Sequence, residues 1–242
     1  MKSCNQIFKI ENLTGGYAGK PVIKYINLGL SKGEICCVIG EEGAGKTTLI
    51  KAIVKQIDSL GLVYFKNQDL SNFTTSEMIR NNIDFIIQGG NILNGFTVEE
   101  HINLAMMDKI ESEKSLIWKE IEVTFPKIIL LKKQFAGRLS GGERMILSMA
   151  CLLSTDAEMW LLDEPTAGIA PETCRLFGNF LIRMQQERGK TILMTEHNYD
   201  FAFEISDTVV ILRDGKLHEK YLSNVFLQPD FIETKLYGTL SK

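Results

Sequence analysis

The chain of 242 residues lacks any apolar run that approaches the roughly 20 residues needed for a membrane-spanning helix. Its first residues, Met1 to Gln6, lack the apolar core of a secretion signal. A net charge of −3 gives no general electrostatic reason to expect nucleic-acid binding. These absences favour a protein of the cytosol, which could still dock on a partner embedded in a membrane.

Cysteine and histidine are scarce, with five and three residues respectively. The number of cysteines is odd, no Cys-x-x-Cys pair occurs, and the histidines lack the close spacing of zinc ligands. We therefore expect buried thiols in a reducing compartment and no structural zinc site. The cysteines are Cys4, Cys36, Cys37, Cys151 and Cys174, and the histidines are His101, His197 and His218.

The pattern of apolar residues predicts an α/β fold. Residues 5–39 alternate between apolar and polar positions, with turns expected at Gly15-Gly16 and at residues 31–33, which indicates an antiparallel β region. Farther along, apolar strand-like runs alternate with helical stretches, which favours a mostly parallel sheet covered by helices. Expected strands are 61–65, 83–87, 159–162, 191–195, 208–212 and 216–221, and expected helices include 76–82, 171–187 and 198–204.

One segment differs from the rest. Residues 92–153 contain helical stretches at 98–107, 115–123 and 142–153 without strand-like runs. This predicts a helical subdomain inserted into the α/β core. Residues 222–242 are expected to form a small helix and tail, so that 1–242 make up one domain.

A glycine-rich stretch joins the apolar run 35–39 to a helical run. Two glycines four residues apart are followed by Lys46 and Thr47, which is the spacing of a P-loop. Small residues let several backbone N–H groups face one anion, and the helix start adds its unpaired donors. A strand-to-helix turn relieved by glycine is the alternative. The loop predicts binding of a nucleoside triphosphate, but it does not separate kinases, GTPases, helicases and transporters. It consists of Gly40, Glu41, Glu42, Gly43, Ala44, Gly45, Lys46, Thr47 and Thr48.

A second segment, 159–166, places two acids after an apolar strand, as in a Walker B pattern. Asp163 is expected to hold Mg²⁺ opposite Thr47. Glu164 is expected to polarise the attacking water. The alternative is a pair of exposed acids at a strand end, which is common.

The third segment is Leu139-Ser140-Gly141-Gly142-Glu143. By itself, it is a helix cap with flexible glycines. Because it precedes the helix that leads to Asp163, the chain resembles the ATP-binding subunits of ATP-binding cassette (ABC) transporters, whose signature is Leu-Ser-Gly-Gly-Gln or Glu. The resemblance covers residues from about 5 to 220 and implies the P-loop NTPase fold of ABC ATPases.

The resemblance also implies roles for individual residues. Tyr17 resembles the aromatic residue that stacks on adenine, and Gln88 the glutamine that ligates Mg²⁺ and senses the membrane partner. His197 resembles the switch histidine that binds the γ-phosphate and orients Glu164. The implied metal ligands are therefore Thr47, Gln88 and Asp163, and the implied catalytic residues are Glu164, His197 and Lys46. Ser140, Gly141, Gly142 and Glu143 would contact ATP held by a second copy.

Two ATPase subunits would therefore meet head to tail around two ATP, as a homodimer or with a paralogue. Transmembrane permease subunits, an extracytoplasmic substrate-binding protein and a place on the inner face of the cell membrane are also implied. The run from Glu164 to Pro171 and the segment Phe125-Pro126-Lys127 resemble the branched-chain amino acid transporters. Ala170 replaces the usual aspartate of that loop, and Glu41-Glu42 are unusual beside a phosphate site unless they point outward.

Three further hypotheses compete with import of branched-chain or related amino acids or amides. One is an exporter of lipid or lipopolysaccharide, whose ATPases share the Glu-His motif. Another is an ABC protein that acts on ribosomes or DNA, but those usually carry two cassettes or a long coiled-coil insertion. The last is a regulatory binder without enzymatic activity, which the presence of Lys46, Asp163, Glu164 and His197 disfavours.

Overall fold

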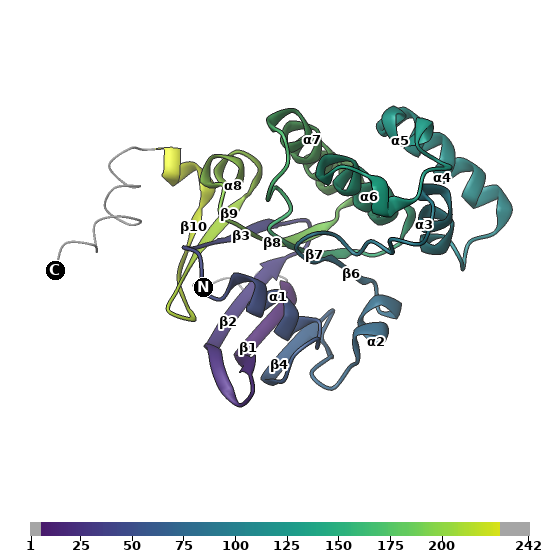
Figure 1. Cartoon of the computed structure of the whole chain (residues 1–242). Coiled ribbons are helices and arrows are strands. Elements are labelled where there is room, and N and C mark those ends of the chain that lie inside the picture. Colours follow the sequence, from purple (N-terminus) through teal and green to yellow (C-terminus); the bar gives the residue numbers. More distant parts are fainter. Residues whose placement is uncertain (1–5, 228–242) are drawn as a thin grey trace.

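The computed structural model describes residues 6–227, in which two sheets and a set of helices form the α/β arrangement that the sequence predicts (Figure 1). One sheet has the order β2-β1-β4-β5 and antiparallel pairing. The other has the order β10-β9-β3-β8-β7-β6, and its strands are parallel except for the hairpin of β9 and β10. The strands are β1 (Gln6–Tyr17), β2 (Lys20–Ser31), β3 (Ile35–Ile39), β4 (Ser59–Phe65), β5 (Gln68–Asp69), β6 (Ile83–Ile86), β7 (Met159–Asp163), β8 (Thr191–Glu196), β9 (Thr208–Arg213) and β10 (Lys216–Leu222).

The helices divide between the two faces of the six-stranded sheet. The helix α1 contacts β1, β2 and β4 on one side and β7 and β8 on the other, so it lies between the two sheets. The helices α6 and α7 cover the opposite face (Figure 1). The helices are α1 (Lys46–Ile53), α2 (Thr75–Arg80), α3 (Val98–Ala105), α4 (Glu111–Thr124), α5 (Pro126–Leu130), α6 (Gly141–Ser154), α7 (Pro171–Arg188) and α8 (Tyr199–Ile205), with short 3₁₀ turns at Ala136–Arg138 and Ser223–Leu227.

The apolar run in β3 is explained by a core on each face of the sheet. Ile35, Cys37 and Ile39 belong to the core that includes α6 and α7, whereas Cys36 and Val38 belong to the core around α1. All five side chains are buried. Because side chains alternate across a strand, a parallel strand with helices on both faces reads as continuously apolar. Packing of both faces of β3 also holds the carboxyl end of this strand in position, where the glycine-rich loop begins.

The helices between β6 and β7 form one group, α3 to α6, at one end of the molecule (Figure 1). The helix α3 packs on α6, and α4 and α5 also contact α6. The sequence pattern predicted helices in this segment, but it did not separate α5, which begins at Pro126 immediately after α4. The expected C-terminal helix and tail lie mostly outside the described residues.

The turn expected at Gly15-Gly16 is wrong, because both residues lie within β1. A Cβ on Gly15 would lie 2.9 Å from the Ala52 Cβ, and one on Gly16 would lie 2.0 Å from the Lys20 carbonyl oxygen. These glycines therefore permit close approach rather than chain reversal. The reversal occurs at Ala18 and Gly19, which have φ angles of 49° and 75°.

No helix within residues 6–227 has the length and apolar character needed to cross a membrane.

Candidate functional site

The P-loop leaves β3 at Gly40 and enters α1 at Lys46. A Cβ on Gly40 would lie 2.3 Å from the Leu212 carbonyl oxygen, so only glycine fits beside β9. Gly43 and Gly45 have φ angles of 80° and 106°, a region that glycine adopts at little cost. The two glycines turn the backbone onto the start of α1, where the helix has unpaired N–H donors.

The Lys46 ammonium lies among three oxygen atoms. It donates to the carbonyls of Gly40 at 2.8 Å and Glu41 at 3.0 Å, and its Nζ lies 3.1 Å from Glu164 Oε1. The lysine is 5% exposed. A buried lysine needs such partners, since burial without them would cost several kcal/mol. The structure therefore brings together Lys46 and Glu164, which are 118 positions apart.

Asp163 ends β7 and is fully buried. Its Oδ1 accepts hydrogen bonds from Thr47 at 3.2 Å and from Thr195 at 2.8 Å. Its Oδ2 is buried and has no hydrogen-bond partner. Burial raises the pKa of the Asp163 carboxyl, although the bonds from Thr195 and Thr47 oppose that shift. An unpartnered buried carboxylate oxygen beside a hydroxyl fits a bound cation, which would satisfy the oxygen and favour its charged form.

Within residues 6–227, no group of three or more His, Cys, Asp or Glu side chains is arranged to hold a metal ion.

Glu164 follows Asp163 in a strained backbone conformation, with a φ angle of 46°. Its backbone N–H donates to the Thr195 carbonyl at 3.1 Å, which fixes the turn beside β8. Its Oε2 accepts a hydrogen bond from Gln88 Nε2 at 3.2 Å and lies 4.0 Å from His197 Nδ1. The structure therefore brings Gln88 and His197 to the same carboxylate, with Lys46 on its other oxygen.

Glu196 is a structural residue that the sequence reasoning missed. Its buried carboxylate accepts hydrogen bonds from the Thr166 backbone and hydroxyl, each at 2.9 Å, and from the N–H groups of His197 and Asn198. Burial raises the pKa of Glu196, and these hydrogen bonds oppose the shift. We call Glu196 and its three partners the Glu196 clamp. The signal was an acid at the end of a mostly apolar, buried strand.

Glu41 and Glu42 are exposed, as the sequence analysis required for acids beside a phosphate site. They line a cavity of about 190 Å³ together with Tyr199, Arg213 and Asp214, so the P-loop has a polar hollow on the side of β9. Tyr17 is 47% exposed at the end of β1, opposite Lys20. A ring at this position is open to a ligand, and its contact with adenine stays a prediction.

The segment from Ser140 to Glu143 caps α6. The Ser140 hydroxyl accepts from the Glu143 N–H at 3.3 Å, and the Ser140 N–H donates to the Glu143 carboxylate at 2.9 Å. This reciprocal pair holds the pKa of Glu143 below its usual range. Gly141 faces the Gly168 carbonyl, and Gly142 faces Thr173. The hydrogen bonds and ion pairs recorded in residues 6–227 do not link this segment with the P-loop of the same chain.

Comparison with known proteins agrees with this geometry. The family model described as "ABC transporter" matches residues 23–167. The chain is 30% identical to the probable branched-chain amino acid transport ATP-binding protein LivF of Archaeoglobus fulgidus, over 96% of this chain and 99% of that protein. It is 32% identical to the methionine import ATP-binding protein MetN of Legionella pneumophila (strain Paris), over 97% and 71%.

A solved structure of an ATP-binding cassette of an ABC transporter, in its ADP conformation, has a TM-score of 0.80 with this chain. Its sequence identity is 25%, and the match covers 96% of this chain and 99% of that one. The family match, the relatives and the fold lead to one conclusion: the chain belongs to the ABC transporter family, in which it is an ATPase subunit.

Proposed function

We propose that this chain supplies ATP hydrolysis for the import of branched-chain or related amino acids or amides. The observation that carries the proposal is the cluster of Lys46, Asp163, Glu164 and His197 side chains at one edge of the six-stranded sheet. That edge is formed by the carboxyl ends of parallel strands, where ligands bind in open α/β sheets. The names of the relatives, LivF and MetN, support an amino acid as cargo.

The residues at this edge of the sheet have different roles in ATP hydrolysis. Lys46 and the P-loop N–H groups bind the phosphates of ATP, and Thr48 continues the helix start. Glu164 polarises the attacking water, because its carboxylate lies 3.1 Å from the ammonium of the lysine that binds the phosphates. His197, the residue after β8, contacts the γ-phosphate and lies 4.0 Å from Glu164. Catalysis rests on positioning and charge stabilisation, without a covalent intermediate.

Mg²⁺ would be held by Asp163, the Thr47 hydroxyl and Gln88. The unpartnered Oδ2 of Asp163 supports this assignment. When bound, the ion would neutralise charge on the phosphate oxygens. Gln88 already reaches Glu164, so one amide connects the carboxylate with the segment that leads into α3.

A second ATPase subunit completes the site. The segment Ser140–Glu143 is capped and lies away from the P-loop of its own chain, with Gly168 and Thr173 as neighbours. Ser140, Gly141, Gly142 and Glu143 would therefore meet ATP bound to the other subunit, and the loop 166–170 would accompany them. Tyr17 would stack on the adenine ring.

The permease would dock in an apolar groove between β6, α3 and α6. The groove has a volume of about 330 Å³, and Leu104 and Met107 are exposed at it. Asp84 and Asp108 are the charged groups that line it, and the Ser148 hydroxyl is buried there without a hydrogen-bond partner. Cytoplasmic loops of membrane proteins are rich in Lys and Arg, so a basic, apolar loop fits this lining. The ATPase would then lie on the inner face of the membrane, and an extracytoplasmic binding protein would deliver the cargo.

A mixing experiment tests the two-subunit site. Chains that carry Lys46→Ala lose the P-loop lysine but keep the signature segment, and chains that carry Ser140→Arg lose the signature. Each variant alone should be inactive. In an equimolar mixture, about half of the dimers contain both variants, and each of these has one intact site. The mixture should therefore recover up to about half of one active site per dimer on average. If the mixture stays inactive while the wild-type chain hydrolyses ATP, the head-to-tail site is wrong.

The cargo needs a separate experiment. Purification of the tagged chain from its own membranes should retain permease subunits, and vesicles with that complex should take up leucine or a related amino acid only with ATP inside. Uptake of an unrelated solute, or export of lipid, would contradict the proposed cargo.

A further inference from the structure

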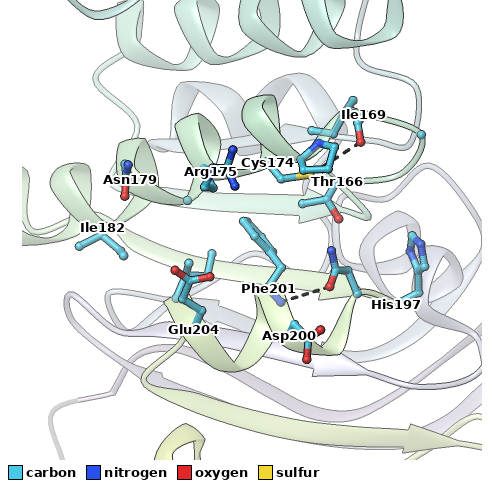
Figure 2. Close-up of a pocket in the computed structure, with 15 residues that line it drawn as sticks. Thr166, Ile169, Cys174, Arg175, Asn179, Ile182, His197, Asp200, Phe201 and Glu204 are labelled. Atoms are coloured by element: carbon cyan, nitrogen blue, oxygen red, sulfur yellow. Dashed lines mark hydrogen bonds between the residues drawn. The ribbon is translucent and has the colours of Figure 1, made fainter.

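A cavity of about 710 Å³ lies between α7 and α8, and no P-loop residue lines it (Figure 2). We call it the α7–α8 cleft. The two helices approach closely at Gly178, where a Cβ would lie 3.1 Å from Ile205 Cγ2 and 3.2 Å from Phe201 Cε2. Apolar side chains of Ile169, Ile182, Phe201 and Ile205 line the cleft. The lining is therefore mixed, with polar residues beside an apolar part at the close helix contact of Gly178, where a larger residue would require its neighbours to shift.

Opposite charges line the two walls of the cleft. Arg175 is on α7, whereas Asp200 and Glu204 are on α8, four residues apart and so on one helix face. Figure 2 shows Arg175 across from Asp200 and Glu204, with the Phe201 ring between the helices. In the part of the chain that the structure describes, no side-chain hydrogen bond or ion pair is recorded for Arg175, Asp200 or Glu204. All three side chains are exposed, and the cation is not paired with either carboxylate.

This arrangement specifies a ligand chemistry. A guanidinium group binds a carboxylate through two parallel hydrogen bonds, and two carboxylates favour an ammonium group. An apolar lining beside them favours an aliphatic side chain, and the cavity volume falls within the range of small-molecule sites. We propose that the α7–α8 cleft binds a small zwitterion with an apolar side chain, of the class of free aliphatic amino acids. This site does not depend on the proposed cargo.

The cleft also reaches the loops that follow β7 and β8, since Thr166, Gly168 and His197 contribute to its lining. His197 is one of three histidines in the chain, so its imidazole proton signal is easily assigned with a His197→Gln variant. Its side chain is 53% exposed, and a ligand in the cleft would change its surroundings. This provides a binding signal that is independent of ATP turnover.

The experiment is a titration of the full chain, without nucleotide, with L-leucine, followed by the His197 proton signal and by calorimetry. Leucine should shift the signal saturably. N-acetyl-leucine lacks the ammonium group and leucinamide lacks the carboxylate, so each should bind at least about tenfold more weakly, as expected for the loss of one charge-assisted contact. Arg175→Gln should weaken leucine binding to a similar extent, and Asp200→Asn with Glu204→Gln likewise.

Two matched variants serve as controls. Glu187→Gln removes an exposed acid from α7 outside the cleft, and Arg80→Gln removes an exposed cation from α2; both should bind leucine like the wild-type chain. Absence of a leucine shift in the folded wild-type chain overturns the proposal, as does equal binding of the three compounds or unchanged binding by Arg175→Gln. ATP turnover is measured on the same samples, so that a loss of ATP hydrolysis can be distinguished from a loss of leucine binding in the cleft.

Discussion

Lys46 and Glu164 form an ion pair across the ATP site, with 3.1 Å between Nζ and Oε1, and both side chains are largely withdrawn from solvent. The pair joins the residue expected to bind phosphate with the residue expected to activate water. The carboxylate therefore lies where it would compete with a phosphate oxygen for the ammonium. We propose that ATP would displace Glu164 from Lys46, which would free the carboxylate to accept a proton from water.

Glu164→Gln should abolish turnover but strengthen ATP binding. The amide cannot serve as a base, which should lower the ATPase rate by about 10²–10⁴-fold, and it no longer competes as an anion for Lys46. Phosphate release and binding of a fluorescent ATP analogue measure the two effects on one sample. Near wild-type turnover would count against Glu164 as the base.

Lys46→Ala should lower the affinity for ATP by about 10–100-fold, because charge-assisted hydrogen bonds to the phosphates are lost. The change also leaves the Glu164 carboxylate without its cation. Lys51→Ala, on the same helix and outside the site, is the control and should bind ATP normally. Equal affinities for both variants would refute the P-loop assignment.

Removal of Mg²⁺ by EDTA should stop ATP hydrolysis, and added Mg²⁺ should restore it. Asp163→Asn should lose that dependence, because the unpartnered Oδ2 is replaced by an amide nitrogen, which cannot ligate the ion. The measurement is ATP affinity with and without Mg²⁺ in both chains. A wild-type chain that hydrolyses ATP equally well in EDTA would show that the proposed metal site is wrong.

Glu196→Ala should destabilise the chain by about 1–3 kcal/mol and reduce turnover, because the buried donors of Thr166 and the partly buried donors of His197 and Asn198 lose their acceptor. Urea unfolding and ATPase assays measure the two effects. Glu187→Ala removes an exposed glutamate of α7 and should change neither. If unfolding is unaffected by Glu196→Ala, the clamp is not a stabilising element.

Cysteine alkylation should distinguish the thiols by burial. Burial raises the pKa of Cys36 to about 11 and that of Cys151 to about 12, so neither should react in the native chain at pH 8, whereas the less buried Cys174 should react before these two. Mass spectrometry after iodoacetamide treatment gives the order.

The same pKa shifts have a consequence for stability. A thiol whose pKa is raised in the folded chain contributes stability that is present below its unfolded pKa of 9.0 and is lost as the pH rises toward about 11. Stability should therefore fall above pH 9 and fall less in a Cys36→Ser chain. Rapid labelling of Cys36 at pH 8 would contradict its burial.

Much of the fold follows from periodicity. The continuous apolar runs of β3, β7 and β8 predicted buried parallel strands because each strand faces a core on both sides. The turn in the first hairpin was misplaced, because a glycine that permits close packing and a glycine that reverses the chain look alike in a sequence. Gly15 packs against Ala52, a contact that depends on where α1 lies in the fold.

The site was predictable where a residue type is tied to a local motif, and it was not where a residue acts through distant partners. Lys46 and Thr47 follow from the loop spacing, and the structure places Thr47 beside Asp163, as expected. Glu196 has no motif, because its role depends on Thr166, which is 30 residues away in the chain. The charges of the α7–α8 cleft were missed for the same reason, since α7 and α8 are separated by β8.

The Glu196 clamp has one further consequence. A single carboxylate holds the beginnings of two loops, one that continues toward the signature segment of the same chain and one that carries His197. Rotation of one loop therefore strains the other. In a pair of subunits, a movement of His197 after phosphate cleavage at one site would shift Glu196. That shift would move the loop after Thr166, which lies at the surface that covers the neighbouring site.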